Sequence, residues 1–116
     1  MSVEGCIPTV DALRVAYPNV EIFAIPHGRA TGDLMTLFEM DALPEVAQLR
    51  GPSNSSIFVD EKGHAGQILK DMGALIWLGA IYGVDVSGYT FDRGYTTDIS
   101  GMAHTIVSED EYTRQP

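Results

Sequence analysis

The sequence has little cysteine and few basic residues. Cys6 is the only cysteine among 116 residues, so no intramolecular disulfide can form, and we expect a reducing, cytoplasmic environment. Seven lysines and arginines stand against sixteen acidic residues, which gives a formal net charge of −9. Phosphate neutralisation dominates binding to nucleic acids and to anionic lipids. This sparse and scattered basic set therefore argues against both kinds of partner.

The sequence also lacks an apolar run long enough to cross a membrane. Its longest uncharged stretch, the thirteen residues from Met72 to Val84, lies between Asp71 and Asp85. A membrane-spanning helix needs about 20 apolar residues. The stretch is therefore predicted to be buried in protein, either in the core of this chain or against a partner.

What the sequence does contain is enough apolar material for one globular domain. Hydrophobic residues make up 45% of the chain, an ordinary share for such a domain. We expect a single domain over residues 1–107 and an acidic, flexible tail over residues 108–116. The predicted fold class is α+β, with a largely antiparallel sheet, one long apolar helix packed on its face, and one or two short helices.

Two short helices are predicted from capping and breaking residues. The first runs from Thr9, a suitable N-cap, to Tyr17, and is ended by Pro18. The second runs over residues 41–50 and is stopped by Gly51-Pro52.

Strands are predicted where branched and aromatic residues gather, at residues 20–25, 34–40, 57–59 and 103–107. Residues 34–40 also fit the start of a helix. Asp92-Arg93-Gly94 is predicted to be the loop of a hairpin that places Phe91 opposite Tyr95.

The uncharged stretch belongs to a predicted long helix from about His64 to Tyr82, with a buried strand as the alternative. One side of this helix carries Gly79 and Gly83 and is expected to lie close to the sheet. A second side begins with Gln67 and Lys70 and continues with apolar residues. Those apolar residues need a cover, which we expect to be a second subunit or an apolar pocket: Ala74, Trp77, Leu78, Ile81 and Tyr82.

The best candidate for catalysis is the loop of residues 26–33. His27 is suited to act as a general base, Arg29 to clamp an anion, and Asp33 to orient either side chain. The alternative is a polar loop in which these charges are simply solvated. The loop matches neither a phosphate-binding nor a dinucleotide-binding fingerprint.

His64 is predicted to lie at the start of the long helix, where the helix dipole lowers the pKa of an imidazole. The three histidines, His27, His64 and His104, have no local spacing typical of metal ligands, so neither a metal nor a cofactor is expected. A site assembled in space from His27, His64 and carboxylates such as Asp60 or Asp98 stays open.

These observations lead to three hypotheses about function. The first is a non-enzymatic binding protein that forms a homodimer through the helix side containing Trp77, with a small apolar or cationic ligand as a further partner. The second is a small cofactor-independent hydrolase, lyase or isomerase that uses His27 and Arg29. The third is an acidic protein that occupies the basic surface of a partner.

Overall fold

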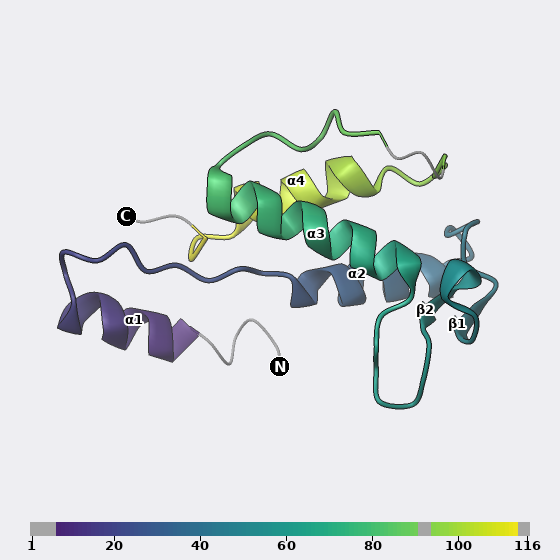
Figure 1. The fold of residues 1–116 in the computed structure, drawn as a ribbon, viewed down its shortest axis with the longest axis horizontal. Helices are drawn as coiled ribbons and strands as arrows, with labels where there is room; N and C mark the ends of the chain where they lie inside the picture. The colour runs from purple at the N-terminus through teal and green to yellow at the C-terminus, as the bar shows by residue number, and fades with distance from the viewer. Residues whose placement is uncertain (1–6, 91–93, 114–116) are drawn as a thin grey trace.

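A computed structural model describes residues 7–90 and 94–113 of the chain. Figure 1 shows the elements in this order: helix α1 (Ile7–Ala16), helix α2 (Gly28–Glu39), strand β1 (Gln48–Arg50), the 3-10 helix η2 (Ser53–Ser55), strand β2 (Ser56–Phe58), helix α3 (Gln67–Tyr82) and helix α4 (Ile99–Glu109). None of the helices among the described residues has both the length and the apolar character needed to cross a membrane.

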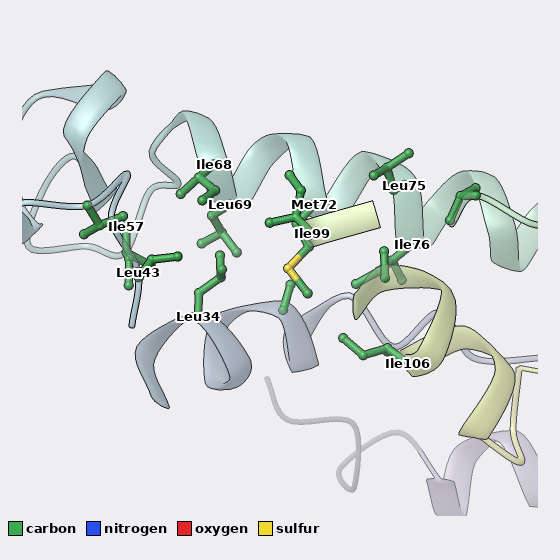
Figure 2. Close-up of a cluster of buried hydrophobic side chains, with 14 residues drawn as sticks. Leu34, Leu43, Ile57, Ile68, Leu69, Met72, Leu75, Ile76, Ile99 and Ile106 are labelled. Carbon is green, nitrogen blue, oxygen red and sulfur yellow. The ribbon is translucent and has the colours of Figure 1, made fainter. Parts of the chain in front are cut away.

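The hydrophobic core forms around α3, which packs against α4, α2 and β2 (Figure 1). Met72 and Ile76 of α3 are fully buried, as are Leu34 of α2 and Ile106 of α4 (Figure 2). Burying a side chain of this size contributes about 1.5–3 kcal/mol to stability. Contacts between helices therefore provide most of the core, and the sheet adds one edge of it.

The sheet is much smaller than predicted. Among the described residues the sheet consists of β1 and β2 alone, which run parallel, with Gln48 opposite Ser56 and Arg50 opposite Phe58; an isolated antiparallel bridge joins Phe58 to Ala65. The prediction of a small domain with mixed helix and strand is confirmed. The prediction of a largely antiparallel sheet is wrong, because most of the segments expected to be strands are helical or extended without a partner strand.

Residues 34–40 lie almost entirely in α2, so the preferred prediction of a strand there is wrong. Ala30 and Leu34 are buried four residues apart, which is the spacing of one helix face. A sequence window that starts at Leu34 leaves out Ala30, which belongs to the segment predicted to be a polar loop. The helical spacing is therefore not visible in that window. Asp41 adopts a left-handed conformation (φ 60°) just after Met40, the C-cap of α2, so it follows a helix end and does not begin the predicted helix of residues 41–50. That segment forms a turn and then β1.

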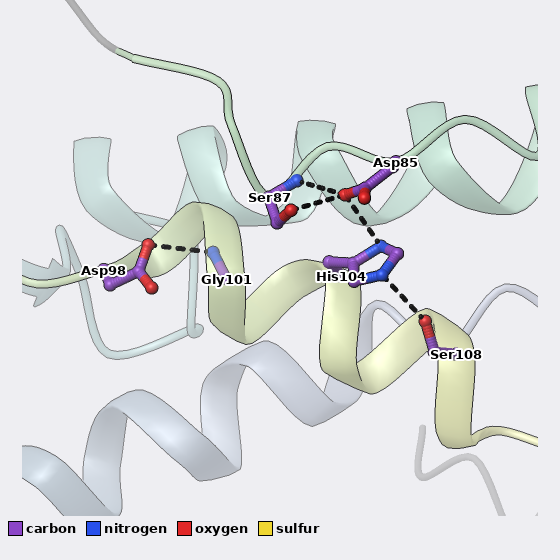
Figure 3. Close-up of polar contacts among 6 residues, drawn as sticks. All are labelled: Asp85, Ser87, Asp98, Gly101, His104 and Ser108. Atoms are coloured by element: carbon purple, nitrogen blue, oxygen red, sulfur yellow. Dashed lines mark hydrogen bonds and ion pairs between the residues drawn. The ribbon is translucent and has the colours of Figure 1, made fainter.

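Residues 103–107 lie in α4, and the predicted strand is wrong here as well. The Asp98 side chain accepts a hydrogen bond from the Gly101 backbone N–H at 3.0 Å and caps the helix (Figure 3). Ile99, Ala103 and Ile106 are buried at helical spacing. Branched residues at 105–107 resemble a strand only when the cap and Ile99 are left out of the window.

The predicted long helix is confirmed as α3, although it begins at Gln67 and not at His64. Its glycine side does not face the sheet. Gly79 lies against Val107 of α4, where a β-carbon would meet the Val107 methyl groups at about 3.5 Å. Gly83 caps α3 in the left-handed conformation that glycine adopts without strain.

Helix α1 is confirmed close to its predicted bounds and lies at one end of the elongated molecule (Figure 1). It is held through Arg14, whose Nε donates to the Ile22 carbonyl at 2.8 Å and whose guanidinium lies over the Tyr112 ring. Residues 20–25 are extended, but in place of a partner strand Ala24 N–H donates to the Tyr112 carbonyl at 2.7 Å. In place of the predicted strand, these residues form an extended connection with no partner strand among the described residues.

Some predictions fall outside the described residues. Cys6 and the hairpin residues Phe91, Asp92 and Arg93 lie there, so the pairing of Phe91 with Tyr95 stays a prediction. The proposed boundary at residue 107 falls inside α4, which continues to Glu109, and Thr113 beyond it is buried.

Candidate functional site

The exposed side of α3 carries a continuous set of large apolar side chains. We define the α3 face as Ala74, Trp77, Leu78, Ile81 and Tyr82, which are all exposed. Trp77 is 46% exposed, Leu78 40%, Ile81 47% and Tyr82 71%. At 100° per residue, residues 74, 77, 78 and 81 form one stripe, so this surface is a single helix side and not scattered positions.

Next to this face lies one of the predicted catalytic residues. The His27 ring stacks on the Trp77 indole, with 5.9 Å between ring centroids and 28° between their planes. Arg29, two residues further along, is exposed. Asp33 instead lines a hollow of about 640 Å³ between α2 and α4, together with Asp98. The structure thus places His27 on the α3 face and Asp33 in a separate hollow, and their catalytic roles stay a prediction.

His64 lies in the loop before α3 and its side chain is mostly exposed. Its ring Nδ1 contacts the Asp60 carboxylate, which also accepts hydrogen bonds from the backbone N–H groups of Lys62 and His64. The hydrogen bond from the His64 ring, with those from the backbone, lowers the pKa of Asp60 below its usual value. This pair closes the loop between β2 and α3.

A second polar cluster, which the sequence did not predict, joins the end of α3 to α4. His104 Nδ1 lies 3.3 Å from Asp85 Oδ1, and its Nε2 lies 3.3 Å from the Ser108 hydroxyl (Figure 3). Asp85 also accepts from the Ser87 hydroxyl at 2.5 Å and from the Ser87 backbone N–H at 2.8 Å. The Ser87 hydroxyl, then its N–H, and to a smaller extent His104, lower the pKa of Asp85, so this carboxylate stays ionised.

This cluster lines a pocket of about 550 Å³, which we call the α3–α4 pocket. Its polar lining comes from Glu21, Asp85, His104, Ser108 and Thr113, and its apolar lining includes Ile81, Val84 and Val107. The side-chain oxygen of Thr113 is buried and has no hydrogen-bond partner in the described part of the chain. Buried polar atoms are normally satisfied, so this hydroxyl needs an explanation.

The order Asp85–His104–Ser108 is that of an orienting acid, a general base and a nucleophile. Ser108, however, lies in the last turn of α4, where the helix dipole places negative potential. Acyl transfer to a serine builds an oxyanion on the substrate carbonyl beside the hydroxyl, and that oxyanion needs positive potential around it. The cluster is thus better suited to hold a positive charge than to catalyse acyl transfer.

The sequence held a signal for this cluster, but it depended on the secondary structure. His104 and Ser108 are four residues apart, so they become neighbours only when the segment is a helix. The strand predicted at 103–107 and the tail predicted from residue 108 separated them.

The described residues contain no group of three or more His, Cys, Asp or Glu side chains arranged to hold a metal ion. Comparison of the chain with protein-family models, curated proteins and solved structures finds no match. Function is therefore inferred from the α3 face and the α3–α4 pocket.

Proposed function

We propose that the protein is a non-enzymatic binding module that forms a homodimer through the α3 face. The observation that supports this is the stripe of residues 74, 77, 78 and 81, which remains exposed while the opposite side of α3, with Met72 and Ile76, is buried in the core. Contiguous apolar surface of this kind, with an aromatic residue near its centre, is typical of protein interfaces. Trp77 and Tyr82 are residue types that dominate binding energy where they are buried.

A second copy of the chain is the occupant that suits this stripe best. In a twofold dimer the same patch must match itself. The centre of the stripe lies between Trp77 and Leu78, so an antiparallel pair of α3 helices places Trp77 against Leu78 of the partner subunit and Ala74 against Ile81 of the partner subunit. Small Ala74 then faces a larger side chain, which allows the two helices to approach closely.

The charges at the ends of α3 also favour the antiparallel pair. Lys70 is exposed and belongs to the same helix side, one turn before Ala74. In the twofold arrangement it lies against the carboxyl end of the partner's α3, where the helix dipole is negative and where Asp85 follows. Lys70 thus supplies the positive charge that this interface needs, although the chain as a whole has a net charge of −9.

The test is the molar mass in solution of the wild type and of a Trp77→Asp variant, measured by sedimentation velocity over a range of concentrations. We expect a concentration-dependent dimer for the wild type. In the variant, a buried charge replaces a central aromatic residue. The dissociation constant of the dimer should therefore rise about 30-fold or more, which corresponds to a loss of about 2 kcal/mol of binding free energy.

The matched control is Val15→Asp, which introduces the same charge at an exposed apolar position on α1. It should dimerise like the wild type. Circular dichroism of both variants checks that α3 still folds. A wild type that stays monomeric at millimolar concentration would refute the proposal, as would equal dissociation of the two variants.

A further inference from the structure

We propose that the α3–α4 pocket binds a small organic cation, namely an ammonium group attached to an apolar body. The pocket lies between the end of α3, the segment that follows it and α4, and part of its rim is Ile81 and Tyr82. Ile81 and Tyr82 also belong to the α3 face, and in the proposed dimer Lys70 of the partner subunit lies near Asp85, so the Trp77→Asp variant tests this pocket apart from the dimer.

The polar lining of the pocket selects for positive charge. Glu21 and Asp85 both line it, and among the described residues that do so there is no lysine or arginine. Ser87 and His104 both contact Asp85 and keep its carboxylate in place, and the carboxyl end of α4 adds negative potential nearby. An anionic ligand would meet repulsion here, whereas an ammonium group can bind to either carboxylate.

The remaining lining selects for an apolar body of limited size. Ile81, Val84 and Val107 present aliphatic side chains, and Gly79 keeps α3 close to α4 at the base of the pocket. A pocket with an apolar lining and few polar groups is the usual form of a small-molecule site. The volume of about 550 Å³ accommodates a single aromatic or short aliphatic group.

Thr113 is the independent observation that indicates a ligand. This residue is only 6% exposed and lines the pocket, and its hydroxyl has no hydrogen-bond partner among the described residues. A buried hydroxyl without a hydrogen-bond partner lowers the stability of the fold, and a bound ligand can remove this cost. Because Thr113 lines the pocket, rotation of its side chain would present the hydroxyl to an ammonium donor bound there.

The experiment uses three probes of the same shape and different charge: phenethylammonium, phenethyl alcohol and phenylacetate. Each is titrated into the full-length protein by isothermal titration calorimetry, and the backbone amides of Gly79 and Gly83 are followed by NMR. We expect phenethylammonium to bind at least tenfold more tightly than the alcohol, and phenylacetate not to bind. Repeating the titration with Trp77→Asp separates this site from the dimer, since binding should persist.

Two substitutions locate the site. Asp85→Asn and Glu21→Gln should each weaken phenethylammonium binding about five- to tenfold, while the equivalent changes away from the pocket, Asp60→Asn and Glu39→Gln, should leave it unchanged. Glu21 is exposed, so its substitution keeps the test valid even if Asp85→Asn disturbs the fold. The proposal fails if the three probes bind equally, if none binds at millimolar concentration, or if both pocket variants bind like the wild type.

Discussion

Gly66, directly before α3, is the residue at which the local backbone leaves least room. A β-carbon at this position would lie 2.1 Å from the Ser56 carbonyl oxygen, and Gly66 N–H donates to the Ile57 carbonyl at 2.6 Å. The start of α3 is therefore pressed directly against β2. This contact sets the distance between the helix that carries the α3 face and the small sheet.

We expect Gly66→Ala to lower the free energy of unfolding by about 1–3 kcal/mol, because the backbone has to move to accept the methyl group. Gly73→Ala is the matched change within α3, since a β-carbon there meets nothing within 4 Å. It should raise the free energy of unfolding by about 0.5–1 kcal/mol, because alanine favours a helix more than glycine does. Urea denaturation measures both, and opposite signs are required. A Gly66→Ala variant at least as stable as the wild type would show that the start of α3 is not pressed against β2.

Among the elements, α1 and α3 could be predicted from the sequence and α2 and α4 could not. The long apolar run of α3 exceeds the usual length of a strand, and Pro18 follows two residues after the end of α1. The buried stripes of α2 and α4 each begin in a polar segment, at Ala30 and Ile99, so the short apolar windows that follow resemble strands. Packing between helices then determines the secondary structure of these two segments, and local propensities do not include that packing.

The same reasoning separates the two candidate sites. The stripe that begins at Ala74 depends on one helix alone, and its need for a cover was predicted from the sequence. The α3–α4 pocket depends on residues distant in the sequence, from Glu21 to Thr113, that only the packing of α3 on α4 brings together. Its cluster around His104 was therefore missed.

Glu45 links two elements that are distant in the chain. Its carboxylate accepts hydrogen bonds from the Thr96 and Thr97 backbone N–H groups at 2.6 and 3.0 Å, and from the Thr97 hydroxyl at 2.5 Å. Partial burial raises the pKa of Glu45, but the hydrogen bonds from Thr97 and Thr96 outweigh it and lower the pKa below its usual value. The ionised carboxylate thus holds the segment before α4 against the turn before β1.

This lowered pKa fixes the direction of a pH dependence. A carboxyl group with a lower pKa in the folded state stabilises the protein above its unfolded pKa of about 4.3, and this contribution is lost as the pH falls through the folded pKa. We expect Glu45→Gln to lower the free energy of unfolding by about 1–2 kcal/mol at pH 7 and to make acid unfolding less steep. Thermal unfolding between pH 3 and pH 7 measures this. Glu61→Gln, at an exposed position, is the control and should keep the slope of the wild type.

At the scale of the whole molecule, shape and charge have opposite effects on association. The chain is elongated, with extents of 46 × 31 × 20 Å, and α3 lies near its middle (Figure 1). The side chains of the α3 face are exposed and therefore accessible to a second copy. A net charge of −9 on each subunit opposes any close contact between them. A dimer therefore requires that its interface be neutral or locally complementary, and the antiparallel pairing of α3 meets this requirement through Lys70.

Lys70→Glu and Lys62→Glu change the net charge equally, so comparing them isolates the local effect of Lys70. Both lysines are exposed, but only Lys70 lies on the helix side of the α3 face. We expect Lys70→Glu to raise the dissociation constant of the dimer about three- to tenfold more than Lys62→Glu at 0.1 M salt, since two symmetric exposed contacts each contribute a few tenths to 1 kcal/mol. The difference should shrink at 1 M salt, where the Debye length falls from about 10 Å to about 3 Å. Sedimentation at both salt concentrations measures it. If the two variants dissociate alike at 0.1 M salt, Lys70 does not face the carboxyl end of the partner helix, and a parallel or offset pairing of α3 would replace the antiparallel one.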